Sequence, residues 1–231
     1  MKKLLLILLC VPLIGFSQIF TEPTTLNLID EYDPNWSPGN NLPIFGPIGW
    51  SKDGIFAYQM TYCAGPCLDC CGNYISVESA KTDKQIDVID LNSDENGSIE
   101  SSWNENQKEI DSLLLKYNIR NTGFGEFYRS NKLENFEIIL KQRSNNRCDD
   151  PVFGTSINYQ VLLGNNKVGY KRVTSREIEC LYTGLNFEGY FISPFEDRIL
   201  IVLSAATQGY EGEKDYDLYF YGCSLNPSTF K

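Results

Sequence analysis

The stretch of residues 49–77 constrains the fold most, because two β-favouring runs flank a short segment that holds four cysteines. The first run, residues 55–62, is rich in the aromatic and bulky side chains that fit a pleated surface. An Asp-Gly pair directly precedes it, and glycine adopts the positive φ of a tight turn at low cost. The second run, residues 74–77, alternates apolar and polar side chains as a half-buried strand does. We therefore predict a β-hairpin whose tip, residues 63–72, carries the cysteines.

The N-terminus predicts export from the cytoplasm. Two lysines at positions 2 and 3 precede a short apolar run over residues 4–16, and small residues close to its end suit cleavage before Gln18. The run is shorter than the ~20 residues that cross a bilayer. We expect a signal peptide over residues 1–17, no membrane insertion after its removal, and a mature chain in the periplasm or outside the cell. Lipidation at Cys10 is the alternative, although leucines directly precede that cysteine.

Seven of the eight cysteines remain in the mature chain, since Cys10 falls within the signal peptide. An oxidising compartment favours disulfides over zinc bound by thiolates. The disulfide candidates are Cys63, Cys67, Cys70, Cys71, Cys148 and Cys180. We expect Cys148 and Cys180 to form a long-range bridge, whereas Cys223 is left over or takes a spare thiol of the hairpin tip.

Within the tip, Cys63 or Cys67 is expected to join one of the adjacent pair Cys70 and Cys71, because neighbouring side chains in an extended segment point apart. Cys67 and Cys70 also have the C-x-x-C spacing of thiol oxidoreductases, whose low thiol pKa depends on a helix N-terminus in a βαβ unit. No βαβ pattern surrounds the hairpin. A structural disulfide is therefore the favoured interpretation, with redox chemistry and a four-thiolate zinc knuckle as alternatives.

The absence of histidine excludes more chemistries than any other feature of the composition. Ser-His-Asp and Cys-His nucleophile pairs, HExxH zinc sites and imidazole general bases all require it. The net charge is −10, and removal of two lysines with the signal peptide leaves 18 basic against 30 acidic side chains, a net charge of −12. This acidity argues against nucleic acid and against anionic membrane surfaces as partners.

The distribution of proline divides the chain. Residues 18–48 contain five prolines, and proline is excluded from helix interiors and from central strands. We predict a Pro-rich N-terminal arm there, irregular or built of edge pieces. Residues 49–231 are predicted to form a single β-rich domain, with two blade-like halves, 49–120 and 121–231, as the alternative.

One amphipathic helix is predicted over residues 102–117, with Ser101 or Ser102 as its N-cap. Its apolar residues have the spacing i, i+3, i+4, i+7 and are Ile110, Leu113, Leu114 and Tyr117. Strand patterns separated by turns occupy the second half of the chain, at residues 136–141, 157–163, 167–173, 198–204 and 216–221. The sequence therefore predicts a β-dominated α+β fold of antiparallel meanders and hairpins with one helix.

Two turns resemble the repeats of β-propellers. Residues 50–54 read W-S-K-D-G before the apolar run at 55–58, which is similar to the W-S-x-D-G turn before the inner strand of a blade. Residues 189–202 are similar to a second copy, in which Arg198 occupies the place of the turn glycine. The arrangement also resembles that of small uncharacterised secreted proteins of the Bacteroidota. The resemblance implies blade-like meanders and no particular activity.

A candidate calcium loop precedes the predicted helix. Asn92, Asp94 and Asn96 place oxygen side chains at alternate positions before Gly97, as calcium loops do. Trp103 stands where an EF-hand loop has its bidentate glutamate, so an Asx-rich turn is the competing interpretation. We expect no cofactor, with calcium at this loop as the alternative.

Two further patterns lie near the C-terminus. Acidic side chains alternate at Glu211, Glu213, Asp215 and Asp217, as they do in a solvated acidic loop, a cation site or the carboxylate pair of a glycosidase. Tyr219 and Tyr221 share a strand face, which is open for stacking on sugars or a protein partner unless a second sheet covers it.

These patterns favour a secreted, non-enzymatic binding or structural module, extracellular or associated with the cell envelope, with an unknown protein or glycan ligand. The alternative is an enzyme that uses carboxylates to act on glycans. A deep pocket with two convergent carboxylates favours the enzyme, whereas a shallow sheet with exposed tyrosines favours the module.

Overall fold

The structure is a computed structural model of the 231-residue chain and describes residues 19–29, 42–63, 71–91, 99–145, 155–178, 182–208 and 214–230. Three antiparallel four-stranded sheets make up most of these residues. The predicted β-dominated α+β fold is confirmed.

Each sheet is assembled mainly from strands that are neighbours in sequence. Sheet A has the order β1-β2-β3-β4, and its strands span Ile44–Trp50, Ile55–Cys63, Cys71–Ser79 and Lys84–Asp90. Sheet B has the order β12-β11-β10-β5, and its strands span Lys214–Ser224, Arg198–Gln208, Tyr182–Ile192 and Phe127–Tyr128. Sheet C has the order β6-β7-β8-β9, and its strands span Lys132–Leu133, Phe136–Asn145, Ser156–Asn165 and Gly169–Ile178.

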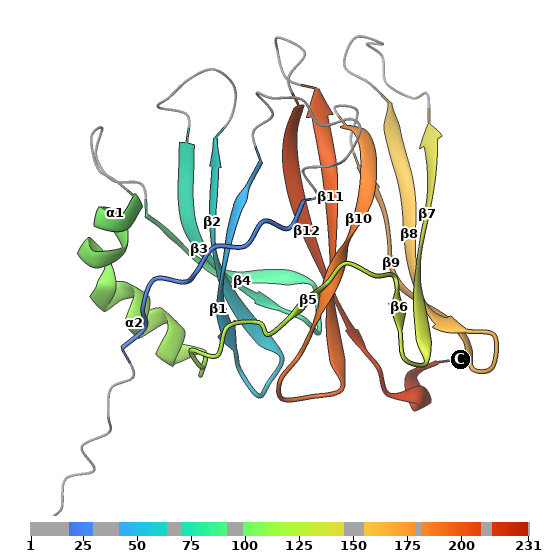
Figure 1. The fold of residues 1–231 in the computed structure, drawn as a ribbon, viewed down its shortest axis with the longest axis horizontal. Coiled ribbons are helices and arrows are strands. Elements are labelled where there is room, and N and C mark those ends of the chain that lie inside the picture. Colours follow the sequence, from blue (N-terminus) through green and yellow to red (C-terminus); the bar gives the residue numbers. More distant parts are fainter. Residues whose placement is uncertain are drawn as a thin grey trace, which may run out of the picture.

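The elements stack in four layers, with the helices at one end and sheet C at the other (Figure 1). One face of sheet A packs on the helices in a cluster that includes Leu114. Its other face packs on sheet B in a cluster that joins Phe45 to Phe220. The opposite face of sheet B packs on sheet C, where Ile201 and Val161 belong to one cluster. Sheet B is therefore covered on both faces.

The sequence of β11 explains why sheet B is central. Every residue from Ile199 to Ala205 is fully buried, including Ser204. A strand that buries both faces needs a nearly continuous apolar run, because no side chain along it points to water. The central strand predicted for residues 198–204 is confirmed, and β12 is its predicted partner over residues 216–221.

The helical segment is longer than predicted and is broken in two. Helix α1 spans Ile99–Glu105, helix α2 spans Gln107–Lys116, and Asn106 separates them. The predicted start at Ser101 or Ser102 is wrong, because both serines lie inside α1. The side-chain amide of Asn106 donates to the carbonyl of Ser102 at 2.8 Å and shares this acceptor with the backbone N–H of Asn106, which lies 3.3 Å from it.

The apolar stripe of the predicted helix is confirmed, because all four of its residues pack in the cluster between the helices and sheet A. Ile110, Leu113 and Leu114 are buried against sheet A. Tyr117 follows α2 as its C-cap and is half-buried. Its hydroxyl donates to Asp87 on β4 at 3.0 Å, which ties the end of α2 to the edge of sheet A.

Part of the Pro-rich arm belongs to the core. Phe20 is fully buried beneath the helices, and its backbone N–H donates to Asp111 at 3.0 Å. Leu26 forms an isolated antiparallel bridge with Phe45 on β1. Strand β1 itself is an edge strand that includes Pro47, in line with the exclusion of proline from central strands. The predicted boundary at residue 49 falls within this strand.

Candidate ligand-binding site

Most of the predicted metal and acidic site residues lie outside the described part of the chain. Asn92, Asp94 and Asn96 of the calcium-like loop do so, and so do Glu211 and Glu213. Asp215 and Asp217 lie on β12. Within the described residues, no group of three or more histidine, cysteine, aspartate or glutamate side chains is arranged to hold a metal ion.

Four of the six disulfide candidates also lie outside the described part of the chain. Cys67, Cys70, Cys148 and Cys180 lie outside the described residues, as do the side chains of Cys63 and Cys71, and no disulfide is found in the part that is described. Cys223 is a free thiol between sheets B and C, and burial raises its pKa. Cys63 ends β2 and Cys71 begins β3, directly opposite each other.

The tyrosine face of β12 is covered by sheet C. Tyr221 is buried, and its hydroxyl shares a hydrogen bond with the hydroxyl of Tyr159 on β8. The guanidinium of Arg176 lies over the Tyr221 ring, 5.4 Å from its centroid. Tyr219 is partly buried against the same cluster. Tyr221 is a core residue and Tyr219 packs against the same cluster, so the two rings do not form an open stacking platform.

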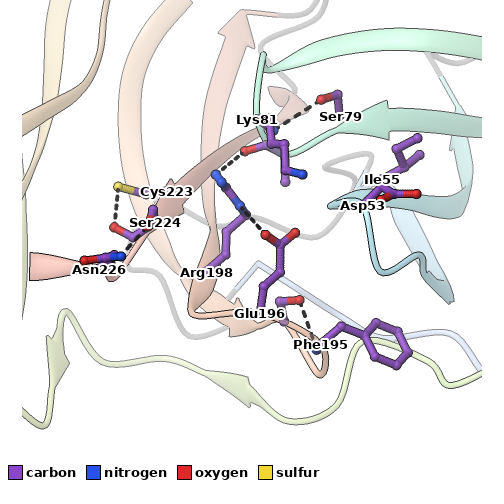
Figure 2. Close-up of polar contacts among 12 residues, drawn as sticks. Asp53, Ile55, Ser79, Lys81, Phe195, Glu196, Arg198, Cys223, Ser224 and Asn226 are labelled. Atoms are coloured by element: carbon purple, nitrogen blue, oxygen red, sulfur yellow. Dashed lines mark hydrogen bonds and ion pairs between the residues drawn. The ribbon is translucent and has the colours of Figure 1, made fainter. Parts of the chain in front are cut away.

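The turn at residues 50–54 and the turn between β10 and β11 meet at the junction of sheets A and B. Arg198 begins β11, and its guanidinium donates to the carbonyl of Ala80 at 2.9 Å and lies 3.7 Å from the Glu196 carboxylate. A Cβ at Gly54 would lie only 2.4 Å from that carboxylate. Figure 2 shows Arg198 reaching from the β10–β11 turn to the backbone beside Lys81. This cluster joins the two sheets, and within the described residues Oε1 of Glu196 and Nε of Arg198 are buried without a hydrogen-bond partner.

A second polar cluster is buried between the same two sheets. The Tyr58 hydroxyl donates to the Glu78 carboxylate at 2.5 Å, and the Ser76 hydroxyl donates to the same oxygen at 3.2 Å. Burial raises the pKa of Glu78 above its usual value, although both hydrogen bonds act in the opposite direction. Burial likewise raises the pKa of Tyr58.

We expect Glu78→Gln to stabilise the protein at neutral pH. Because the folded-state pKa of Glu78 is raised, its contribution to stability is present below the unfolded pKa and is lost as the pH rises through the folded pKa. Glutamine keeps an acceptor oxygen for Tyr58 and Ser76 and carries no charge to desolvate. The advantage of the variant in free energy of unfolding should grow with pH in urea titrations from pH 4 to 8. The exposed Glu134→Gln variant serves as control, and an equal pH trend in both would contradict the prediction.

Sheet C has a surface concavity with a volume of about 490 Å³. Three consecutive residues from each of β7, β8 and β9 line it, namely 141–143, 158–160 and 175–177. The register arranges these nine residues in three rows across the strands, Lys141–Gln160–Ser175, Gln142–Tyr159–Arg176 and Arg143–Asn158–Glu177.

The alternation of side chains along a strand shows which rows face solvent. Tyr159 points to sheet B, so the middle row belongs to the inner face. The two outer rows point away from the core, and all six of their side chains are exposed. Positions two residues apart are separated by about 7 Å along a strand. The two rows therefore form the walls of a surface concavity, the sheet C trough, whose floor is the backbone of the middle row.

Positive charge gathers on these strands. Strands β7, β8 and β9 carry five lysines and arginines against two glutamates, a local charge of +3 in a chain of net charge −10. In the trough, Lys141 and Arg143 lie on β7, and Glu177 lies on β9. Neither cation has a hydrogen bond or ion pair to any residue that the structure describes.

The remaining walls of the trough supply neutral hydrogen-bonding groups. Asn158 and Gln160 carry amides that both donate and accept, and Ser175 carries a hydroxyl. Glu177 is the one carboxylate among the lining residues, whereas glycosidases require a pair of carboxyl groups. The trough therefore has the chemistry to bind a polar ligand with negative charge at one end.

Sequence reasoning missed the trough. Its lining residues come from three segments that are separated by 14 or more residues, and their own patterns are ordinary polar alternation. A possible signal was the excess of basic residues between 141 and 176 in an otherwise acidic chain. The strand register that aligns the segments depends on tertiary structure.

Within the described residues, no helix is both long enough and apolar enough to cross a bilayer. Comparison of the chain with protein-family models, with curated proteins and with solved structures found no match in any of the three. The trough, with its lining side chains, is therefore the feature on which a functional assignment rests.

Proposed function

We propose that the chain is an exported, non-enzymatic binding module whose sheet C trough takes an anionic, hydroxyl-rich ligand of the acidic-glycan class. The observation that carries this proposal is the pair of cations without a partner among the described residues, Lys141 and Arg143, on the wall of a concave surface in an acidic chain. An exposed cation in such a chain attracts negative charge most strongly where acidic neighbours are few. Export follows from the signal peptide expected over residues 1–17.

The arrangement of the trough favours a glycan over a nucleic acid. The backbone of a nucleic acid carries closely spaced negative phosphate charges. Both Glu177 and the net charge of −10 of the chain would repel it. An acidic sugar carries one carboxylate per residue among several hydroxyl groups. Lys141 and Arg143 suit the carboxylate, since charge-assisted hydrogen bonds are the strongest available. The side chains of Asn158, Gln160 and Ser175 can form hydrogen bonds with the hydroxyl groups of the sugar.

The proposal predicts that binding depends on the ligand's charge and on the β7 cations. A uronic-acid oligosaccharide should bind the purified mature chain, and its methyl-esterified form, which keeps the hydroxyls but lacks the charge, should bind at least ~10-fold more weakly. The double variant Lys141→Gln, Arg143→Gln should lose about 10-fold or more in affinity for the acidic form, as measured by titration calorimetry at low salt.

The matched control is Lys84→Gln, Lys108→Gln, which removes the same charge from exposed positions on β4 and α2. This control should keep the affinity of the parent within about twofold, because the lost charges lie in other layers of the fold. Equal losses in both double variants would contradict a local site. Release of new reducing ends from the oligosaccharide, abolished by Glu177→Gln, would support the enzymatic alternative instead.

A further inference from the structure

The β2–β3 hairpin of sheet A places two of the cysteines opposite each other. Nine consecutive residue pairs join the strands without a register shift, from Ile55 opposite Ser79 to Cys63 opposite Cys71. Directly opposed residues in antiparallel strands have Cα atoms about 4.5–5.5 Å apart. Disulfides join Cα atoms that are about 4.4–6.8 Å apart. Hydrogen-bonded and non-hydrogen-bonded pairs of opposed residues therefore both have the Cα separation that a disulfide requires.

The neighbouring pairs hold this register. The Tyr62 ring lies across Gly72, where any Cβ would come within 2.3 Å of the ring. The same ring packs edge-on against Tyr74, with the centroids 6.0 Å apart. One pair further along, the Thr61 hydroxyl donates to the Asn73 side chain at 3.3 Å. These contacts fit one alignment only, and they extend to the pair next to the cysteines.

We propose that Cys63 and Cys71 form a disulfide that closes this hairpin in the exported protein. The inference relies on the export in the proposed function and is independent of ligand binding at the trough. A slip of the β2–β3 register by one residue would turn every side chain of one strand to the opposite face. The slip would displace Tyr62 from Gly72, so the register selects Cys71.

The bond forms by thiol–disulfide exchange with a disulfide-bearing oxidant of the compartment, either a protein disulfide or oxidised glutathione. The Cys63 thiolate attacks one sulfur of the oxidant and expels the other as a thiolate. The Cys71 thiolate then attacks the Cys63 sulfur of this mixed disulfide and expels the second thiolate. The cysteine pair loses two electrons and two protons, and the oxidant gains them as two thiols.

The test uses the full-length chain, exported to a bacterial periplasm, with Cys67→Ser and Cys70→Ser combined. Cys63 and Cys71 are then the only tip cysteines. After alkylation without reductant, a protease that cleaves before aspartate cuts at Asp69, between the two cysteines. It releases the segments 53–68 and 69–82. Mass spectrometry should find these segments joined, lighter by two hydrogens than the sum of the reduced peptides, and separated after reduction.

A matched variant, Cys67→Ser with Cys71→Ser, leaves Cys63 and Cys70. It should crosslink less completely than the first variant in the same glutathione redox buffer, because the strand register places Cys71, and not Cys70, opposite Cys63. Equal crosslinking of the two variants, or separate alkylated segments from the first variant in that buffer, would overturn the proposal. If the first variant crosslinks in the buffer but keeps Met1 and its thiols in cells, the disulfide stands and the proposed export fails.

Discussion

Replacing Phe45 with alanine is expected to lower the free energy of unfolding by about 4 kcal/mol, within the range for a buried aromatic side chain. Phe45 is fully buried between sheets A and B. Its ring centroid lies 5.3–6.0 Å from the centroids of four other rings, those of Tyr58, Phe124, Phe191 and Phe220. Truncation removes one partner from each of these contacts. It leaves a cavity that the two sheets could close only by moving closer to each other.

Urea unfolding followed by fluorescence measures this loss. The adjacent Ile44→Ala is the matched control, because Ile44 is 46% exposed on the same strand. A surface substitution of this kind should change the free energy of unfolding by less than about 1 kcal/mol. A similar cost for both variants would show that strand β1 contributes to stability without packing on sheet B.

Replacing Gly222 with alanine is expected to cost about 3 kcal/mol through overpacking against a backbone group. A Cβ at Gly222 would lie 1.8 Å from the carbonyl oxygen of Ala80 and 2.4 Å from its carbonyl carbon. The Gly222 N–H donates to the Asp83 side chain at 2.8 Å, so the strand cannot shift without losing this bond. Only glycine allows β12 to approach the β3–β4 turn so closely.

The control for this variant is Gly123→Ala. Gly123 has φ +61°, and no atom lies within 4 Å of the position that a Cβ would take, so alanine there meets conformational strain but no contact. That strain is worth about 1–2 kcal/mol. Equal losses of stability in Gly222→Ala and Gly123→Ala, measured by urea titration, would show that the contact with Ala80 is not the cause.

Local patterns predicted the kinds of element well, because the period of the hydrophobic pattern depends only on backbone geometry. The hairpin of β2 and β3, the buried strand β11 and the stripe of Ile110 and Leu114 all follow from period or from an unbroken apolar run. The boundary of the helix was less predictable. Asn106 separates α1 from α2, and its side-chain bond to the carbonyl of Ser102 has no counterpart in the hydrophobic pattern.

The candidate site was not predictable in the same way. The pattern along β12 shows that Tyr219 and Tyr221 share a face, but it does not show whether another sheet lies over that face. The packing of sheet C on sheet B buries Tyr221 and partly buries Tyr219. The trough arose on the opposite face of sheet C, where Lys141 and Arg143 remain exposed.

The sequence by itself determined the β-dominated class, the hairpins, the central strand and the exclusion of every histidine-based chemistry. These properties depend on residue type and on spacing within one segment. Only the tertiary structure decided the stacking of three sheets, the burial of Phe20 from the Pro-rich arm, and the alignment of Lys141, Asn158 and Glu177 in one trough. Those features depend on which strand pairs with which and in what register, and distant segments settle that by packing together.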